Sequence, residues 1–220
     1  MRSLSPVMCP GYQNPTLRTI AVPTELRAIQ DAVRQLGQIV AHYRRDHWVL
    51  LRNLISPAFI STCLCDVLNA PSKRVTVGEG VEWWTQHAIE VESSLGQFLI
   101  SSSTLELASA AAGQALKKVP VIWAQVYEVG QMISWHRDGG GDIQFLVCLQ
   151  APSQQCGGAF CIRLNQSEFQ IQLQAGDALL FKATDILHST TRLVVGRDEP
   201  QPRRVTAVAR FFAEQDLPTR

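Results

Sequence analysis

The sequence has no excess of either charge and no long hydrophobic run. Charged residues make up 18% of its 220 positions and the formal net charge is +1, so the chain has no general electrostatic attraction for a polyanion. We therefore expect no nucleic-acid partner. No apolar stretch approaches the length of about 18 residues that indicates a membrane-spanning helix. We accordingly expect no membrane partner.

Disulfide and zinc signatures are also missing. The six cysteines show no repeated Cys-x2-Cys spacing, which argues against a small disulfide-stapled fold and against a sulfur-rich structural zinc site. The segment from Met1 to Pro15 lacks the apolar run of a secretory signal. We expect reduced thiols and a cytoplasmic protein.

The hydrophobic content of 46% over 220 residues is enough for one sizeable core. We expect a single domain over residues 1–220. Within it, residues 1–118 form a part with helices, a short strand and a substrate loop, and residues 119–213 form a β-rich core that holds the functional site.

The first half of the chain has mainly helical signals. Helical spacing of apolar residues, a Ser-Pro helix start and a Ser-x2-Glu capping box predict a helix over Thr24 to Arg45, a buried strand over His47 to Leu51, a helix from Ser56-Pro57 to before Pro71, and a helix from Ser103 to about Lys118.

No period holds between Lys73 and Gly96, so we expect a polar loop there. This loop contains the pair Trp83-Trp84. Two adjacent tryptophans in a loop either line a substrate entrance or lid, or one ring fills a gap in the core. We treat both as candidate substrate contacts.

Short strands separated by turn residues follow Pro120. This pattern is typical of a sandwich or jelly roll, so the predicted fold is mainly β with flanking helices. The predicted strands are Val121 to Tyr127, Met132 to Asp138, Asp142 to Leu149, Ala159 to Leu164, Glu168 to Leu173, Asp177 to Lys182, Leu187 to Leu193 and Arg204 to Phe212.

His136 and Asp138 are the first candidate metal ligands. Alternation along a strand points both side chains to one face, and an imidazole beside a carboxylate supplies two of the three ligands of the facial triad that binds non-haem Fe(II). His188 is the candidate third ligand, because it is the only other histidine among the predicted C-terminal strands. Structural zinc sites prefer four ligands with sulfur, so iron is favoured.

The segment from Val119 to Phe212 resembles the Fe(II)- and 2-oxoglutarate-dependent dioxygenase superfamily, whose core is a double-stranded β-helix, a cupin-like jelly roll. The resemblance rests on the order and spacing of several short pieces: Tyr127-Glu128-Val129-Gly130, His136-Arg137-Asp138, Gly157-Gly158-Ala159-Phe160, Gln174-Ala175-Gly176-Asp177-Ala178-Leu179-Leu180-Phe181, His188 and Arg204-Val205-Thr206.

The resemblance implies Fe(II), 2-oxoglutarate and O2 as cofactor and cosubstrates, with His136, Asp138 and His188 as metal ligands. The distal carboxylate of a 2-oxo acid needs a fixed planar donor, which favours arginine. Arg204 matches the family position for this role. Thr206 and Tyr127 are further expected cosubstrate contacts.

The interval between His188 and Arg204 is longer than is usual in that superfamily. This leaves Arg203 and Arg197 as alternatives for the cosubstrate arginine. Arg204 is favoured because the apolar residues of the last strand then share the face opposite to it. These apolar residues are Val205, Ala207, Ala209 and Phe211.

Arg210 is a third candidate substrate contact, facing a substrate carboxylate. Arg204 and Arg210 also have the spacing found in AlkB-type nucleic-acid demethylases, but those have asparagine where this chain has Thr206, and we interpret the match as incidental. Related halogenases have Gly or Ala in place of Asp138, so the carboxylate here favours hydroxylation or another C–H oxidation.

The expected function is oxidation of a small-molecule metabolite, such as an amino acid or a natural-product intermediate, with release of succinate and CO2. Three alternatives stay open at this stage. They are a protein or nucleic-acid side-group hydroxylase or demethylase of the same superfamily, a metal-dependent cupin-type hydrolase or isomerase, and a noncatalytic module that retains only the fold.

Overall fold

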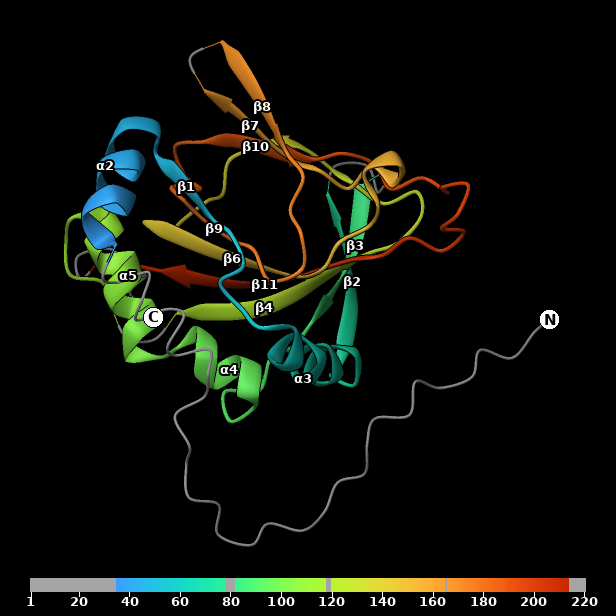
Figure 1. The fold of residues 1–220 in the computed structure, drawn as a ribbon, viewed down its shortest axis with the longest axis horizontal. Helices are drawn as coiled ribbons and strands as arrows, with labels where there is room; N and C mark the ends of the chain where they lie inside the picture. Colours follow the sequence, from blue (N-terminus) through green and yellow to red (C-terminus); the bar gives the residue numbers. More distant parts are fainter. Residues whose placement is uncertain (1–34, 78–81, 118–119, 165, 214–220) are drawn as a thin grey trace, which may run out of the picture.

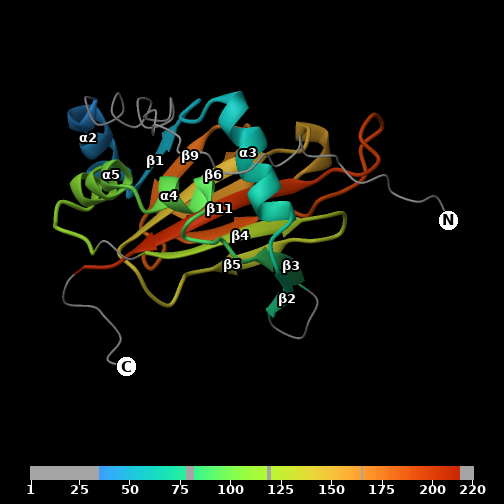
Figure 2. The ribbon, with the colours of Figure 1, turned by 90° about the horizontal axis from the view of Figure 1, so that it is seen from below.

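The computed structural model describes residues 35–77, 82–117, 120–164 and 166–213, without the side chains of Val77, Glu82 and Trp83. Two antiparallel sheets face each other, and the helices cover the outer face of the larger sheet (Figures 1 and 2). The helices are α2 (Leu36–Asp46), α3 (Pro57–Leu68), α4 (Ser94–Leu99) and α5 (Ser102–Ala112).

The larger sheet has seven strands in the order β1-β9-β6-β11-β4-β3-β2, and the smaller has four in the order β5-β10-β7-β8. All eight strands predicted after Pro120 are present. The strands are β1 (Trp48–Leu51), β2 (Ser72–Val77), β3 (Glu82–His87), β4 (Val121–Tyr127), β5 (Ile133–His136), β6 (Ile143–Gln150), β7 (Phe160–Leu164), β8 (Ser167–Ile171), β9 (Ala178–Phe181), β10 (Leu187–Thr190) and β11 (Arg204–Phe211).

Helix starts follow from serine caps. Ser56 Oγ accepts a hydrogen bond from the Phe59 backbone N–H at 3.3 Å, as the Ser-Pro signal predicts. Helix α5 begins earlier than predicted, because its N-cap is Ser101 and not Ser103. The helix ends at Ala112, short of Lys118, because Gly113 adopts φ 71° and terminates it. The helix predicted over Thr24 to Arg45 is present as α2 in its second half, and its part before residue 35 lies outside the described residues.

The segment between Lys73 and Gly96 is not the predicted polar loop. It forms the hairpin β2–β3, which pairs through β3 with β4, followed by helix α4. The tryptophan pair therefore lies on a strand. The residues of β2 show no alternation because most of them are exposed, so the pairing of β3 with β4 determines the structure there more than burial does.

Strand β11 has an apolar outer face and a mixed inner face. Its outward side chains Val205, Ala207, Ala209 and Phe211 pack in the core beneath the helices. Val208 points the other way, into a second core between the sheets. This confirms the register predicted from alternation, which sends Arg204 and Arg210 toward the interior.

Asp177 fixes the turn before β9. Its carboxylate is fully buried and accepts hydrogen bonds from the backbone N–H of Gln174 at 2.8 Å and of Asn53 at 3.1 Å. Arg52 Nη1 lies 2.6 Å from Oδ2, the same oxygen that accepts from Gln174. The turn is thereby joined to the segment between β1 and α3.

Within the described residues, no helix is long and apolar enough to cross a membrane.

Candidate metal centre

A cavity lies between the two sheets, and residues from both sheets line it. The larger sheet supplies mostly polar and aromatic side chains, and the smaller sheet supplies two histidines. The lining residues are Trp123, Gln125, Tyr127, Ile133, His136, Asp138, Gln144, Leu146, Phe160, His188, Thr190, Arg204 and Arg210.

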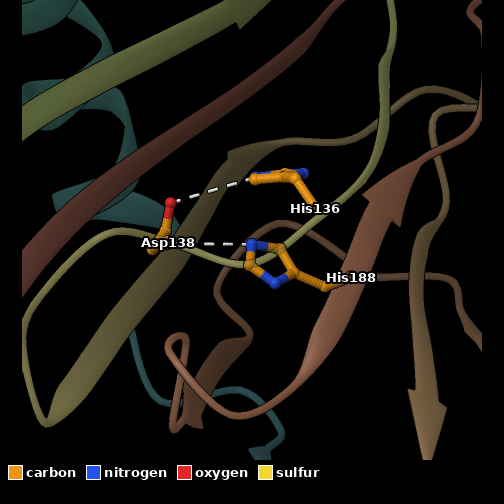
Figure 3. Close-up of side chains that lie close together, drawn as sticks. All are labelled: His136, Asp138 and His188. Carbon is orange, nitrogen blue, oxygen red and sulfur yellow. Dashed lines mark ion pairs between the residues drawn. The ribbon is translucent and has the colours of Figure 1, made fainter.

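His136 and His188 enter this cavity from neighbouring antiparallel strands, where they are direct register partners. Asp138 follows the end of β5, and its backbone N–H donates to the Ala183 carbonyl at 3.0 Å. The three side chains point toward one another (Figure 3). Asp138 Oδ1 lies 3.9 Å from His136 Nε2, and Oδ2 lies 3.8 Å from His188 Nε2.

The three ligand atoms lie within 4.8 Å of one another, and no other group of three such residues occurs among the residues that the structure describes. Two imidazoles and one carboxylate, without sulfur, match the donor set of the facial triad. Asp138 Oδ2 is buried, and its charged or metal-type neighbours are His188 Nε2 at 3.8 Å and Arg210 Nη2 at 2.7 Å. The residues present therefore fit a divalent metal such as iron.

Backbone carbonyls orient both imidazoles. His136 Nδ1 lies 2.8 Å from the Ser134 carbonyl, and His188 Nδ1 lies 2.9 Å from the Ile186 carbonyl. A carbonyl can only accept, so Nδ1 carries the hydrogen and Nε2 keeps its lone pair for a metal. Burial, reinforced by the neighbouring His136, lowers the pKa of His188 to about 4. Its ring is thus neutral at neutral pH.

Arg204 is a buried cation on the same cavity. It is 2% exposed, and its Nη1 donates to Thr190 Oγ1 at 2.9 Å. Its Nη2 is buried without a hydrogen-bond partner, and no carboxylate pairs with it among the described residues. Burial lowers the pKa of Arg204. A buried guanidinium with an unused donor fits an incoming carboxylate.

Tyr127 lies opposite Arg204 in the β4–β11 register, with the Arg204 Cζ 5.4 Å from its ring centroid. Burial raises the pKa of Tyr127 to about 12, so the hydroxyl stays protonated, and it is hydrogen-bonded to Thr190. Thr206 is fully buried, and its hydroxyl donates to Gln125 Oε1 at 3.4 Å. Thr206 does not line the cavity.

The two alternative arginines lie elsewhere. Arg203 Nη2 pairs with Glu128 Oε1 at 2.9 Å, and both side chains are substantially exposed. Arg197 is exposed in the segment that links β10 to β11. Of the three arginines considered, Arg204 is the one that lines the cavity.

The three candidate substrate contacts have different surroundings. Arg210 lines the cavity beside Asp138. Trp84 is 8% exposed and stacks on Tyr127 at 6.2 Å between ring centroids, in a small core with Ile133. It does not line the cavity. The side chain of Trp83 lies outside the described residues.

Sequence reasoning missed several lining residues. Thr190 follows His188 by two positions, so strand alternation already placed it on the same face. Gln144 is the buried polar residue of β6, among apolar neighbours, which is a signal for a polar cavity. Trp123 and Phe160 carried no such signal, because inward aromatic residues are common in any β core.

No protein-family model and no curated protein matches the chain. Solved structures do match its fold. A prolyl hydroxylase from Trichoplax adhaerens, in complex with a hypoxia-inducible-factor peptide, is 15% identical with a TM-score of 0.68, over 90% of this chain and 96% of that one. HygX from Streptomyces hygroscopicus, with nickel and 2-oxoglutarate bound, is 10% identical with a TM-score of 0.67, over 83% and 89%.

The α-ketoglutarate-dependent epimerase SnoN of nogalamycin biosynthesis is 17% identical with a TM-score of 0.60, over 81% of this chain and 84% of that one. The chain shares the fold of these oxygenases. The expected jelly-roll core with flanking helices is confirmed, and so is the resemblance in fold to the superfamily.

Proposed function

We propose that the protein is an Fe(II)- and 2-oxoglutarate-dependent oxygenase that oxidises a small-molecule substrate and releases succinate and CO2. One observation carries this proposal. Three metal-type donors and a buried arginine without a carboxylate partner line the same cavity. A metal alone would account for the donors but not for Arg204.

Each residue has a defined task in this proposal. His136, Asp138 and His188 hold the iron, which when bound supplies the activation of O2. Arg204, with its donor Nη2 unused, binds the distal carboxylate of 2-oxoglutarate, and Thr190 and Tyr127 hold the guanidinium in place. Thr206 donates a hydrogen bond to Gln125, which lines the same cavity.

Asp138 favours hydroxylation or a related C–H oxidation. Its side chain points at both histidines, so the position that would admit a halide in a halogenase contains a carboxylate instead. The buried residues Cys148, Cys156 and Cys161 form no disulfide, which supports the proposal of a reducing compartment such as the cytoplasm.

For the substrate we propose a small polar metabolite, for instance an amino acid or a natural-product intermediate. The polar side chains Gln125 and Gln144 support this, because they line the cavity beside the metal ligands. Trp83 stays a predicted substrate contact, whereas the ring of Trp84 stacks on Tyr127 outside the cavity. The alternative is a peptide substrate, as named for the prolyl hydroxylase of similar fold.

The test is a turnover assay with Fe(II), 2-oxoglutarate and O2 over a panel of free amino acids, natural-product scaffolds and proline-containing peptides. Succinate release that rises with one small molecule, together with its oxygenated product, is the expected result. If only the peptides stimulate succinate release, the substrate is a peptide and not a small molecule. Turnover without 2-oxoglutarate and O2 would identify a hydrolase or isomerase and contradict the proposal.

A further inference from the structure

Arg210 is held in one position by three neighbours around the metal ligands. Its Nη2 lies 2.7 Å from Asp138 Oδ2 and 2.8 Å from Gln144 Oε1, and its Nε lies 3.2 Å from the same Gln144 oxygen. The Arg210 Cζ lies 5.1 Å from the ring centroid of Trp123. The guanidinium is thus fixed against a carboxylate that also faces two histidines.

Gly141 makes room for this arginine. Gly141 adopts φ +90°, and a Cβ at this position would overlap with Cγ and Cδ of Arg210. The third glycine after Asp138 therefore has a specific packing reason, beyond the freedom of a turn. The loop that carries Asp138 and the strand that carries Arg210 therefore pack closely at Gly141.

We infer that Arg210 is a positioning residue, which binds Asp138 Oδ2 so that the carboxylate offers the metal a single oxygen, Oδ1. This inference rests on the proposed function. A carboxylate that bound through both oxygens would occupy one more coordination position, and the facial triad is useful because it leaves positions open. Outer partners of metal ligands commonly have such an orienting role.

The same contacts argue against Arg210 as primarily a substrate contact. The Asp138 carboxylate already pairs with its positive charge, and Gln144 occupies two of its donors. A substrate carboxylate would have to displace or share these partners. A positioning role uses the contacts as they are.

The test measures binding of Mn(II) to the full-length protein, with free Mn(II) quantified by electron paramagnetic resonance. Arg210→Met is compared with Arg203→Met, a matched substitution on an arginine that pairs with Glu128 away from the cavity. We expect Arg210→Met to weaken Mn(II) binding by about 10- to 100-fold and Arg203→Met to leave it unchanged.

The direction of the change in Mn(II) affinity separates loss of charge from loss of orientation. Removing a cation from the neighbourhood of a divalent metal would by itself strengthen metal binding, so weaker binding reports the loss of orientation. Arg210→Lys keeps the charge but loses the planar fork, and we expect it to bind Mn(II) more weakly than the wild type as well. Wild-type or tighter binding in Arg210→Met would overturn the inference.

Water proton relaxation by bound Mn(II) supplies a second readout, since it counts coordinated waters. We expect fewer bound waters in Arg210→Met, because the released carboxylate can bind through both oxygens. A count of bound waters equal to that of the wild type would overturn the inference.

Gly141→Ala disturbs the contact of Arg210 with Asp138 without removing the arginine. This variant serves as the test if Arg210→Met does not fold. We expect weaker Mn(II) binding here too, and little further loss in the double variant, because both changes act through Asp138. Additive losses would contradict this. A wild-type protein that binds no Mn(II) would instead refute the proposed function itself.

Discussion

His136 and His188 lie directly opposite each other on β5 and β10, with ring centroids 4.2 Å apart and each Nδ1 against a carbonyl two residues earlier in its own chain segment. Paired strands therefore set the separation of the two imidazoles. Strand pairing and the two carbonyl contacts place both imidazoles, which reduces the ordering cost of metal binding.

Replacement of His188 by Ala should abolish metal binding. The variant loses one of three ligands, and we expect at least about 100-fold weaker Fe(II) or Mn(II) binding, because loss of even an outer partner costs 10- to 100-fold. Isothermal titration under anaerobic conditions measures this. His42→Ala is the control, since His42 is a surface residue beside Asp46, and equal losses in both variants would contradict the assignment of His188.

Arg204→Met should separate cosubstrate binding from metal binding. Loss of hydrogen bonds from a charged donor costs about 1.5–3 kcal/mol, so we expect the affinity for 2-oxoglutarate to fall by about 10- to 100-fold. Mn(II) affinity should stay at the wild-type value. Arg203→Met is the matched control. If Arg204→Met binds 2-oxoglutarate as tightly as the wild type, Arg204 does not bind the cosubstrate and the prediction is wrong.

The same variant should stabilise the ligand-free protein. The Arg204 guanidinium is buried without a carboxylate partner, and replacement of such a charge by an apolar side chain removes its desolvation cost. A gain of about 1 kcal/mol corresponds to a rise in Tm of about 2–4 °C for a chain of this size. Calorimetry of the ligand-free protein tests this, and a lower Tm would indicate that the guanidinium is already compensated.

Asp177→Asn should destabilise the fold without affecting the metal site. The buried carboxylate accepts two backbone N–H groups and pairs with Arg52, and breaking such a pair leaves polar groups uncompensated. We expect the free energy of unfolding to fall by about 2–4 kcal/mol in urea titration. Mn(II) affinity of the folded variant should match the wild type, whereas a large loss would link this turn to the cavity.

Ser56→Ala should cost about 1 kcal/mol in the free energy of unfolding, because the Phe59 N–H loses its side-chain acceptor at the start of α3. Urea unfolding measures this cost. Ser61→Ala is the control within the same helix, because its exposed hydroxyl donates only to the Pro57 carbonyl. Equal costs in both variants would contradict the capping role of Ser56.

The C-terminal half could be predicted from sequence because alternation and turn residues agree with the final pairing there. The inward register of β11 followed from its apolar outer face, which buries Val205 and Phe211. The hairpin β2–β3 could not be predicted, because β2 is mostly exposed and β4, the strand that pairs with β3, is distant in sequence. Local pattern carries little information about such non-local pairing.

The candidate site was predictable in its ligand set but not in its supporting contacts. The spacing of His136 and Asp138 pointed to one face, whereas the ion pair of Asp138 with Arg210 depends on a packing contact with Gly141. Such contacts arise from how two segments meet in space. The cap of α5 was misplaced for a similar reason, since several serines in succession offer alternative N-caps.

The central claim is that one cavity binds both iron and a 2-oxo acid. An anaerobic titration of the protein with Fe(II) and 2-oxoglutarate, followed by visible absorption, tests it most directly. We predict a charge-transfer band that requires both components, saturates at one equivalent of iron and disappears in His188→Ala. Fe(II) binding without any band on addition of 2-oxoglutarate would contradict the account.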